Sequence, residues 1–166
     1  GGIVAGQSNV VSGSHSFVGA GWSNEVSSAG QNGAIVTGED NAVSARNAFV
    51  GGGHSNQADA EDAVVAAGYL NYTAGIRSFI GAGYSNYITA DYAVIVGGYD
   101  NSATDVYTSV GGGSGNASSD DYATVAGGYS NAASVYAAAV CGGYDNTASA
   151  SYAAVVGGYQ NYASGS

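Results

Sequence analysis

The side chains best suited to hold a ligand in this sequence are aromatic, and they recur at a fixed place. Of the 14 tyrosines, six directly follow a glycine at intervals that are multiples of 15 residues. The tryptophan shares that place in the pattern, and the row reads Trp22, Tyr69, Tyr84, Tyr99, Tyr129, Tyr144 and Tyr159. Aromatic rings with polar rims can stack against sugar rings or pack at a seam between chains. These residues are therefore our candidates for glycan or partner binding, with ring-on-ring stabilisation of a thin fold as the alternative role.

No other set of residues has the spacing that catalysis or metal binding needs. The 12 acidic residues do not recur in register, and the fixed aspartate of calcium-binding repeats is missing. His15 and His54 hold different places in the pattern, so they predict no metal cluster. No nucleophile elbow, carboxylate pair or phosphate-binding loop rises above the glycine-rich background. We therefore expect a protein without catalytic residues, metal or cofactor, and not an enzyme.

The charge balance excludes whole classes of partner. Arg46 and Arg77 are the only lysine or arginine residues, and the formal net charge is −10. Such a chain repels nucleic-acid backbones and anionic lipid surfaces. No stretch of about 18 apolar residues is present, so we expect no membrane insertion. With 45% apolar and only 8% charged residues, the chain should nevertheless fold rather than stay disordered.

A repeat of 15 residues fills the chain and must position the aromatic row. Its marker is an asparagine, which we number as slot 1 of the repeat, in the series Asn9, Asn24, Asn41, Asn56, Asn71, Asn86, Asn101, Asn116, Asn131, Asn146 and Asn161. A fixed period is typical of a stacked solenoid, in which every slot becomes a column along the stack. The asparagines can then form an amide ladder that satisfies the backbone at a corner. The spacing of 17 between Asn24 and Asn41 predicts a small protruding loop around Ala29 to Gly33.

Within each repeat, small and β-branched residues predict two short strands. Slot 10 is valine or isoleucine in every copy, and slots 8 and 12 are small, as in Ala63 and Gly97. This period of two indicates a strand of about five residues that faces a thin core. Slot 13 is always glycine, which indicates a corner with positive φ or no room for a Cβ. A second strand through slot 3 and a looser turn through slots 4 to 6 complete the repeat.

The predicted fold is therefore all-β, a single-stranded parallel β-solenoid of about eleven coils. It forms one continuous domain over residues 1–166, and we expect that domain to be a fragment of a longer fibrous protein. Stacked strands lie about 4.8 Å apart, so the rod would be about 50 Å long.

The outward positions of the slot 10 strand are more apolar than solvent would favour. Slots 9 and 11 contain Phe17, Val36, Phe49, Val64, Phe79, Val94, Val96, Cys141 and Val156. Each phenylalanine shares its strand with a glycine, as Phe17 does with Gly19. Large residues beside small ones fit close packing against another chain. We therefore predict an oligomer seam here, in a parallel homo-oligomer for which a trimer is the preferred form.

The repeat unit also resembles a known family. The pattern A-x-V-x-G-G-x-x-N-x-A-S, seen at residues 123–134, is similar to the head repeats of trimeric autotransporter adhesins (YadA-like), and glycine-rich repeats of this kind also occur in phage tail fibres. The resemblance covers the whole chain and implies a left-handed β-roll, three copies side by side and an adhesive surface. The period of 15 rather than 14, the constant asparagine and the abundant tyrosine depart from that family.

We therefore expect a non-enzymatic structural or adhesive segment of an extracellular trimeric fibre. It would belong to a bacterial cell surface or a virion and present a binding surface to glycans or proteins. The alternatives are a subunit of a purely structural extracellular filament and, with less support from the mixed residues of slots 2 and 4, an ice-binding solenoid. The ligand and the host receptor cannot be read from the sequence.

Overall fold

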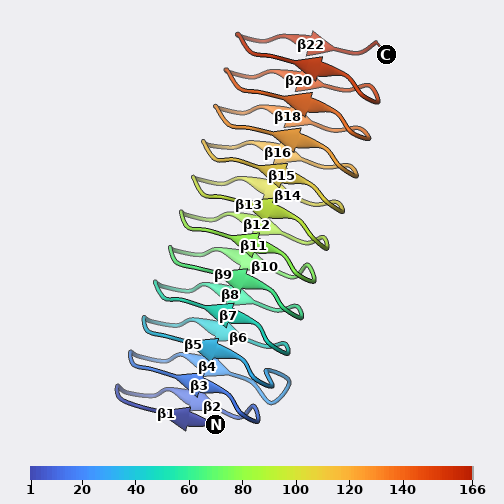
Figure 1. Ribbon diagram of the computed structural model, residues 1–166. Helices are drawn as coiled ribbons and strands as arrows, with labels where there is room; N and C mark the ends of the chain where they lie inside the picture. Colours follow the sequence, from blue (N-terminus) through green and yellow to red (C-terminus); the bar gives the residue numbers. More distant parts are fainter. Residues whose placement is uncertain (166) are drawn as a thin grey trace.

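The computed structural model, which describes residues 1–165, is a stack of flat coils that rises along one axis (Figure 1). The described residues contain two parallel sheets of 11 strands each and no helix. One sheet consists of β1 (Gly2–Ile3), β3 (Phe17–Val18), β5 (Ala34–Ile35), β7 (Phe49–Val50), β9 (Val64–Val65), β11 (Phe79–Ile80), β13 (Val94–Ile95), β15 (Ser109–Val110), β17 (Thr124–Val125), β19 (Ala139–Val140) and β21 (Ala154–Val155). The other consists of β2 (Val10–Val11), β4 (Glu25–Val26), β6 (Ala42–Val43), β8 (Gln57–Ala58), β10 (Tyr72–Thr73), β12 (Tyr87–Ile88), β14 (Ser102–Ala103), β16 (Ala117–Ser118), β18 (Ala132–Ala133), β20 (Thr147–Ala148) and β22 (Tyr162–Ala163). The predicted parallel β-solenoid of about eleven coils is confirmed.

Every strand pairs with the same strand of the neighbouring coils. Phe79 of β11, for example, faces Val64 of β9 on one side and Val94 of β13 on the other. The two strands of one coil belong to different sheets, and the sheets lie face to face (Figure 1). Because the register is the 15-residue repeat, each slot forms a straight column, and one side-chain type can be used many times along the stack.

The strands are shorter than predicted: each has two residues rather than about five. Slots 7 and 15 take the left-handed conformation in each complete coil, as at Tyr92 (φ 59°) and Asp100 (φ 54°), and slot 13 bends the chain as well. Fifteen residues that close a flat coil leave little extended backbone between such bends. Slot 12 therefore lies outside the core, with Ala67 and Ala82 exposed, and its predicted inward position is wrong.

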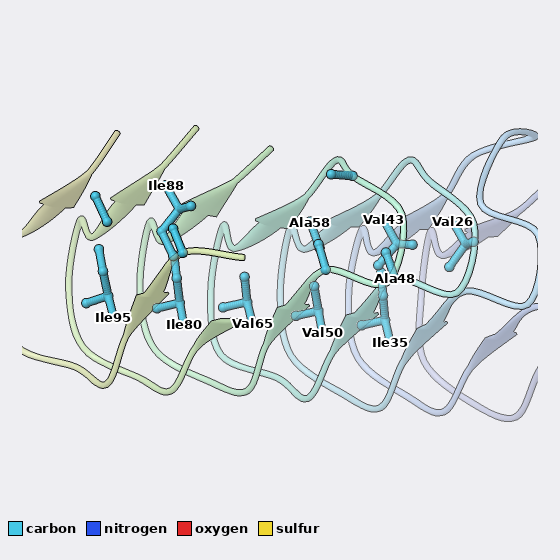
Figure 2. Close-up of a cluster of buried hydrophobic side chains, with 14 of the residues drawn as sticks. Val26, Ile35, Val43, Ala48, Val50, Ala58, Val65, Ile80, Ile88 and Ile95 are labelled. Atoms are coloured by element: carbon cyan, nitrogen blue, oxygen red, sulfur yellow. The ribbon is translucent and has the colours of Figure 1, made fainter. Parts of the chain in front are cut away.

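The core is one column of side chains from each sheet, flanked by small residues. Slot 10 of the odd-numbered strands and slot 3 of the even-numbered strands point toward each other, as Ile80 and Ile88 do (Figure 2). Slot 8, for example Ala63, is buried beside them as predicted. The core is thus only two side chains thick, which is why its members are small or β-branched.

The glycine at slot 13 brings neighbouring corners into close contact. Gly98 has φ +102°, and a Cβ there would lie 2.2 Å from the carbonyl oxygen of Gly113 in the next coil. Both the backbone conformation and the lack of space therefore require glycine. This confirms the corner that the invariant slot predicted.

The 17-residue coil forms the expected loop, but at a slightly different place. Figure 1 shows a wider turn between β4 and β5. The amide of Gly30 donates to the carbonyl of Ser27 (3.0 Å), which leaves Ser28 and Ala29 exposed at the tip. Asn32 takes the ordinary left-handed slot 7 conformation (φ 57°), so the dipeptide Asn32–Gly33 belongs to the regular coil and not to the insertion.

Over residues 1–165 the structure offers no long apolar helix of the kind that crosses a bilayer.

Candidate functional site

The asparagines of slot 1 form a continuous hydrogen-bonded column behind the glycine corners. The backbone N–H and the Nδ2 of Asn101 both donate to Oδ1 of Asn86, at 3.1 and 3.0 Å. The Nδ2 of Asn86 donates to Oδ1 of Asn71 (3.0 Å) and to the carbonyl oxygen of Gly98 (3.0 Å). The same contacts recur along the stack, and no buried side-chain nitrogen or oxygen of the described residues lacks a partner. Because the amides are buried and fully used, this column holds the corners together and is not open to a ligand.

The aromatic residues of slot 14 follow the asparagine column on the outside of the same corners. Backbone bridges link Trp22 to Glu39, Glu39 to His54, and His54 to Tyr69. From His54 the rings stack without a break on Tyr69, Tyr84 and Tyr99, with ring centroids 4.8 to 5.1 Å apart and interplanar angles of 7 to 15°. A second stack joins Tyr129, Tyr144 and Tyr159. The coil spacing thus places the rings at stacking distance, and we call these two stacks the corner columns.

Stacking decides which parts of these rings a ligand can reach. A tyrosine inside a column, such as Tyr84 or Tyr144, has both faces covered by its neighbours and presents only its edge and hydroxyl. Contact with the apolar face of a sugar requires an open ring face. Of the seven predicted binding residues, those inside the columns are therefore poorly placed for sugar stacking, and those at column ends are well placed.

The two corner columns are separated by a single small residue. Ser114 occupies slot 14 between Tyr99 and Tyr129 and bridges to both through the backbone. Residues 111–115 read Gly-Gly-Gly-Ser-Gly, so no large side chain fills the corner at this level. Tyr99 is 54% exposed against 41% for Tyr84, which is stacked on both sides. Tyr99 and Tyr129 thus turn open faces toward each other across Ser114.

A second aromatic column lies at the opposite turn. Tyr92, Tyr107 and Tyr122 of slot 7 stack with centroids 4.8 and 5.2 Å apart, and the guanidinium of Arg77 lies 5.7 Å from the Tyr92 ring centre. The slot 7 tyrosines were expected to form such a column. The stacked pair Tyr72 and Tyr87 on β10 and β12 was missed, although their spacing of 15 would have revealed it.

The predicted seam residues all lie on the outer face of the odd-numbered sheet, which we call the apolar face. Phe17, Phe79, Val36, Val96, Cys141 and Val156 are exposed, while Phe49, Val64 and Val94 are half-buried. Val96 is 58% and Val156 83% exposed. Exposed aliphatic and aromatic side chains that adjoin along several strands mark a surface able to bind another apolar surface.

The pairing of phenylalanine with glycine has a cause within the chain. A Cβ on Gly19 would lie 3.3 Å from Cε1 of Phe17, because the phenyl ring covers its own glycine. The same Cβ would lie 2.2 Å from the carbonyl oxygen of Val36 in the next coil. The large-beside-small pattern therefore does not by itself require a partner chain, and only the exposure of the apolar face still favours one.

Charged side chains gather at two places. At the turn of slots 4 to 7, Asp105 hydrogen-bonds to Asp121 of the next coil and raises the pKa of that carboxyl. At the corner, one ligand atom from each of Glu39, Asp40 and His54 lies within 4.8 Å of the other two. The sequence-based argument compared His54 only with His15 and missed this group. Its signal was present, since Glu39 and His54 occupy slot 14 of adjacent coils.

Comparison with known proteins adds no family. No protein-family model matches the chain, and no curated protein matches its sequence. A function has therefore to be inferred from the residues and their geometry.

Proposed function

We propose that this chain is a non-enzymatic structural and adhesive segment of an extracellular trimeric fibre, on a bacterial surface or a virion, which binds glycans at the gap between its corner columns. The observation that carries the adhesive part is the pair of open ring faces of Tyr99 and Tyr129. They stand on either side of Ser114, one coil away in each direction. The repeat's resemblance to trimeric adhesin heads agrees with such a role.

The gap has the width of one ring. Two coil spacings of about 4.8 Å put the Tyr99 and Tyr129 rings on the order of 10 Å apart. A sugar ring inserted halfway would meet each tyrosine at about 5 Å between centres, the usual distance for stacked rings. A single pyranose could therefore contact two aromatic faces at once.

The charge around the gap favours neutral sugars. Asp100 follows Tyr99 directly and is exposed, so its carboxylate can accept hydrogen bonds from sugar hydroxyls. The same carboxylate, on a chain of net charge −10, repels sialic and uronic acids. We therefore assign neutral hexose-containing glycans as the ligand class.

The oligomeric part of the proposal rests on the apolar face. Its residues are spaced by the coil repeat, so a second copy running in parallel meets the same pattern along its length. Three copies that turn this face toward a common axis would cover it without leaving an open edge, since cyclic arrangements close on themselves. The occupant that we propose is thus a second and a third copy of this chain.

A glycan array followed by titration of the best neutral ligand tests the adhesive part. In Ser114→Tyr the new ring would join the two corner columns and occupy the gap. We expect this variant to bind at least about tenfold more weakly, because two stacking contacts worth about 0.5–1.5 kcal/mol each are lost. Its thermal stability should be equal or higher, which separates loss of the site from loss of the fold.

Tyr144→Phe is the matched control, because it keeps an interior ring of the column and leaves the gap unchanged. It should bind like the unmodified protein. Undiminished glycan binding by Ser114→Tyr, or an array without any neutral ligand, would show that the gap is not the binding site.

A further inference from the structure

We propose that Glu39, Asp40 and His54 form a site for one divalent transition-metal ion of the Zn²⁺ class. One ligand atom from each of the three lies within 4.8 Å of the other two. The site is independent of glycan binding and of oligomerisation, since it uses neither the Ser114 gap nor the apolar face. It lies on the corner at the far end of the Tyr69–Tyr84–Tyr99 stack from that gap.

The coil repeat brings the ligands together. Glu39 and His54 occupy slot 14 of adjacent coils and are linked by a backbone bridge, so their side chains leave the corner one coil spacing apart. Asp40 follows Glu39 in the left-handed slot 15 conformation, with φ 53°. In the other slot 14 positions from Tyr69 to Tyr159 the residue is tyrosine or serine. The metal-binding chemistry is thus a local departure from the repeat.

The imidazole of His54 is held with one nitrogen toward the carboxylate. Its Nδ1 lies 2.9 Å from the Oγ of Ser55, and its ring stacks on Tyr69 with centroids 4.8 Å apart. Its Nε2 faces Oε1 of Glu39. Metal-binding histidines characteristically hydrogen-bond through the second ring nitrogen, which fixes the ring and the tautomer. Ser55 fills that role here, with Nδ1–H as the donor.

The distance between the ligand atoms fits an ion between them. Nε2 of His54 and Oε1 of Glu39 are 3.8 Å apart, which is longer than a hydrogen bond. Two ligands that each bind zinc at about 2.0–2.2 Å in tetrahedral geometry are about 3.4 Å apart. A shift of a few tenths of an ångström by the exposed Glu39 side chain would complete the contact.

The ligand set selects the class of ion. Imidazole with two carboxylates suits zinc and its first-row neighbours, whereas calcium and magnesium prefer oxygen ligands alone. Two carboxylates also give the site a net negative charge that a divalent cation neutralises. The two arginines of the chain both lie at the opposite turn, where Arg46 pairs with Glu61, and Arg77 lies 3.5 Å from Asp62.

Calorimetric titration of the tag-free chain with ZnCl₂ tests the proposal. The unmodified protein should bind one Zn²⁺ per chain. His54→Tyr should weaken binding at least about tenfold, which is one kcal/mol or slightly more. Tyrosine is the usual residue of slot 14, so this variant keeps the stack on Tyr69 and should fold normally. Glu39→Gln, which keeps the size of the side chain, should also weaken binding.

His15→Tyr is the matched control, because it removes the other histidine and introduces a tyrosine at slot 7, where tyrosine also recurs. It should bind Zn²⁺ like the unmodified protein. The fluorescence of Trp22, whose backbone bridges to Glu39, gives a second measurement, since bound Ni²⁺ or Co²⁺ should quench it. Absence of Zn²⁺ binding, or equal binding by His54→Tyr, would overturn the proposal.

Discussion

At the scale of single residues, one buried asparagine holds three coils together. Asn86 accepts two hydrogen bonds from Asn101 and donates to Asn71 and to the carbonyl of Gly98. All of its partners are themselves buried or at a crowded corner. Removing the amide therefore leaves several polar groups without partners and out of reach of water.

We expect Asn86→Ala to lower the free energy of unfolding by about 3 kcal/mol, because unsatisfied buried groups cost about 1–3 kcal/mol each. Denaturant unfolding monitored by circular dichroism measures the change. Asn161→Ala is the control, since Asn161 is exposed and water can replace its contacts, and it should cost less than about 1 kcal/mol. Equal losses in the two variants would mean that the column does not stabilise the stack through its buried hydrogen bonds.

The sequence was informative about residues wherever a slot repeats. The constant asparagine and the constant glycine predicted a hydrogen-bonded column and a tight corner, because both depend on the register alone. Residues that break the repeat were less predictable. The roles of Ser114 and His54 depend on the side chains one coil above and below, which become neighbours only once the register is known.

At the scale of elements, the turns of slots 4 to 7 bring like charges together. Asp121 hydrogen-bonds to Asp105 one coil away, and this contact and the burial that accompanies it raise the pKa of Asp121 above its ordinary value of 3.8. A carboxyl with a raised pKa in the folded state stabilises the fold when protonated. That contribution is complete below pH 3.8 and is lost as the pH rises through the raised pKa.

Asp121→Asn should therefore unfold at a higher denaturant concentration than the unmodified protein at pH 7, and at nearly the same concentration at pH 3. Unfolding curves at both pH values measure the difference. Asp100→Asn removes one charge at the corner instead, and it accounts for the general effect of lowering the net charge. If Asp121→Asn gained no more than Asp100→Asn at pH 7, the contact with Asp105 would not be repulsive.

Strand order and pairing were predictable from the period, but strand length was not. Alternation of small and β-branched residues over slots 8 to 12 indicated five extended residues. The left-handed conformation at slots 7 and 15 shortens them to two, and it occurs at residue types as different as Tyr92 and Asn32. No single residue type marked those bends. The tip of the insertion, Ser28 and Ala29, was displaced from its predicted place for the same reason, since Asn32–Gly33 looked like a turn but is part of the regular coil.

At the scale of the whole molecule, the two sides of the stack differ in chemistry. The odd-numbered sheet carries the apolar face, with Phe17, Val36 and Val96 exposed. The corners carry aromatic edges and hydroxyls. An apolar face would associate with other copies, and a polar aromatic edge would stay in contact with solvent and ligands. This division of surfaces follows from the repeat and supports a fibre whose copies meet along the apolar face.

A charge in that face should separate the copies. Val96→Asp places a carboxylate where the apolar faces would meet, whereas Thr104→Asp adds the same charge to an exposed position beyond β14 of the other sheet. We expect only Val96→Asp to dissociate the oligomer.

Sedimentation equilibrium of the unmodified chain at micromolar concentration tests the trimeric fibre segment most directly. The chain has a mass of 16.1 kDa, so a trimer should sediment at about 48 kDa, three times that mass. A folded monomer of 16.1 kDa at these concentrations would contradict the proposal.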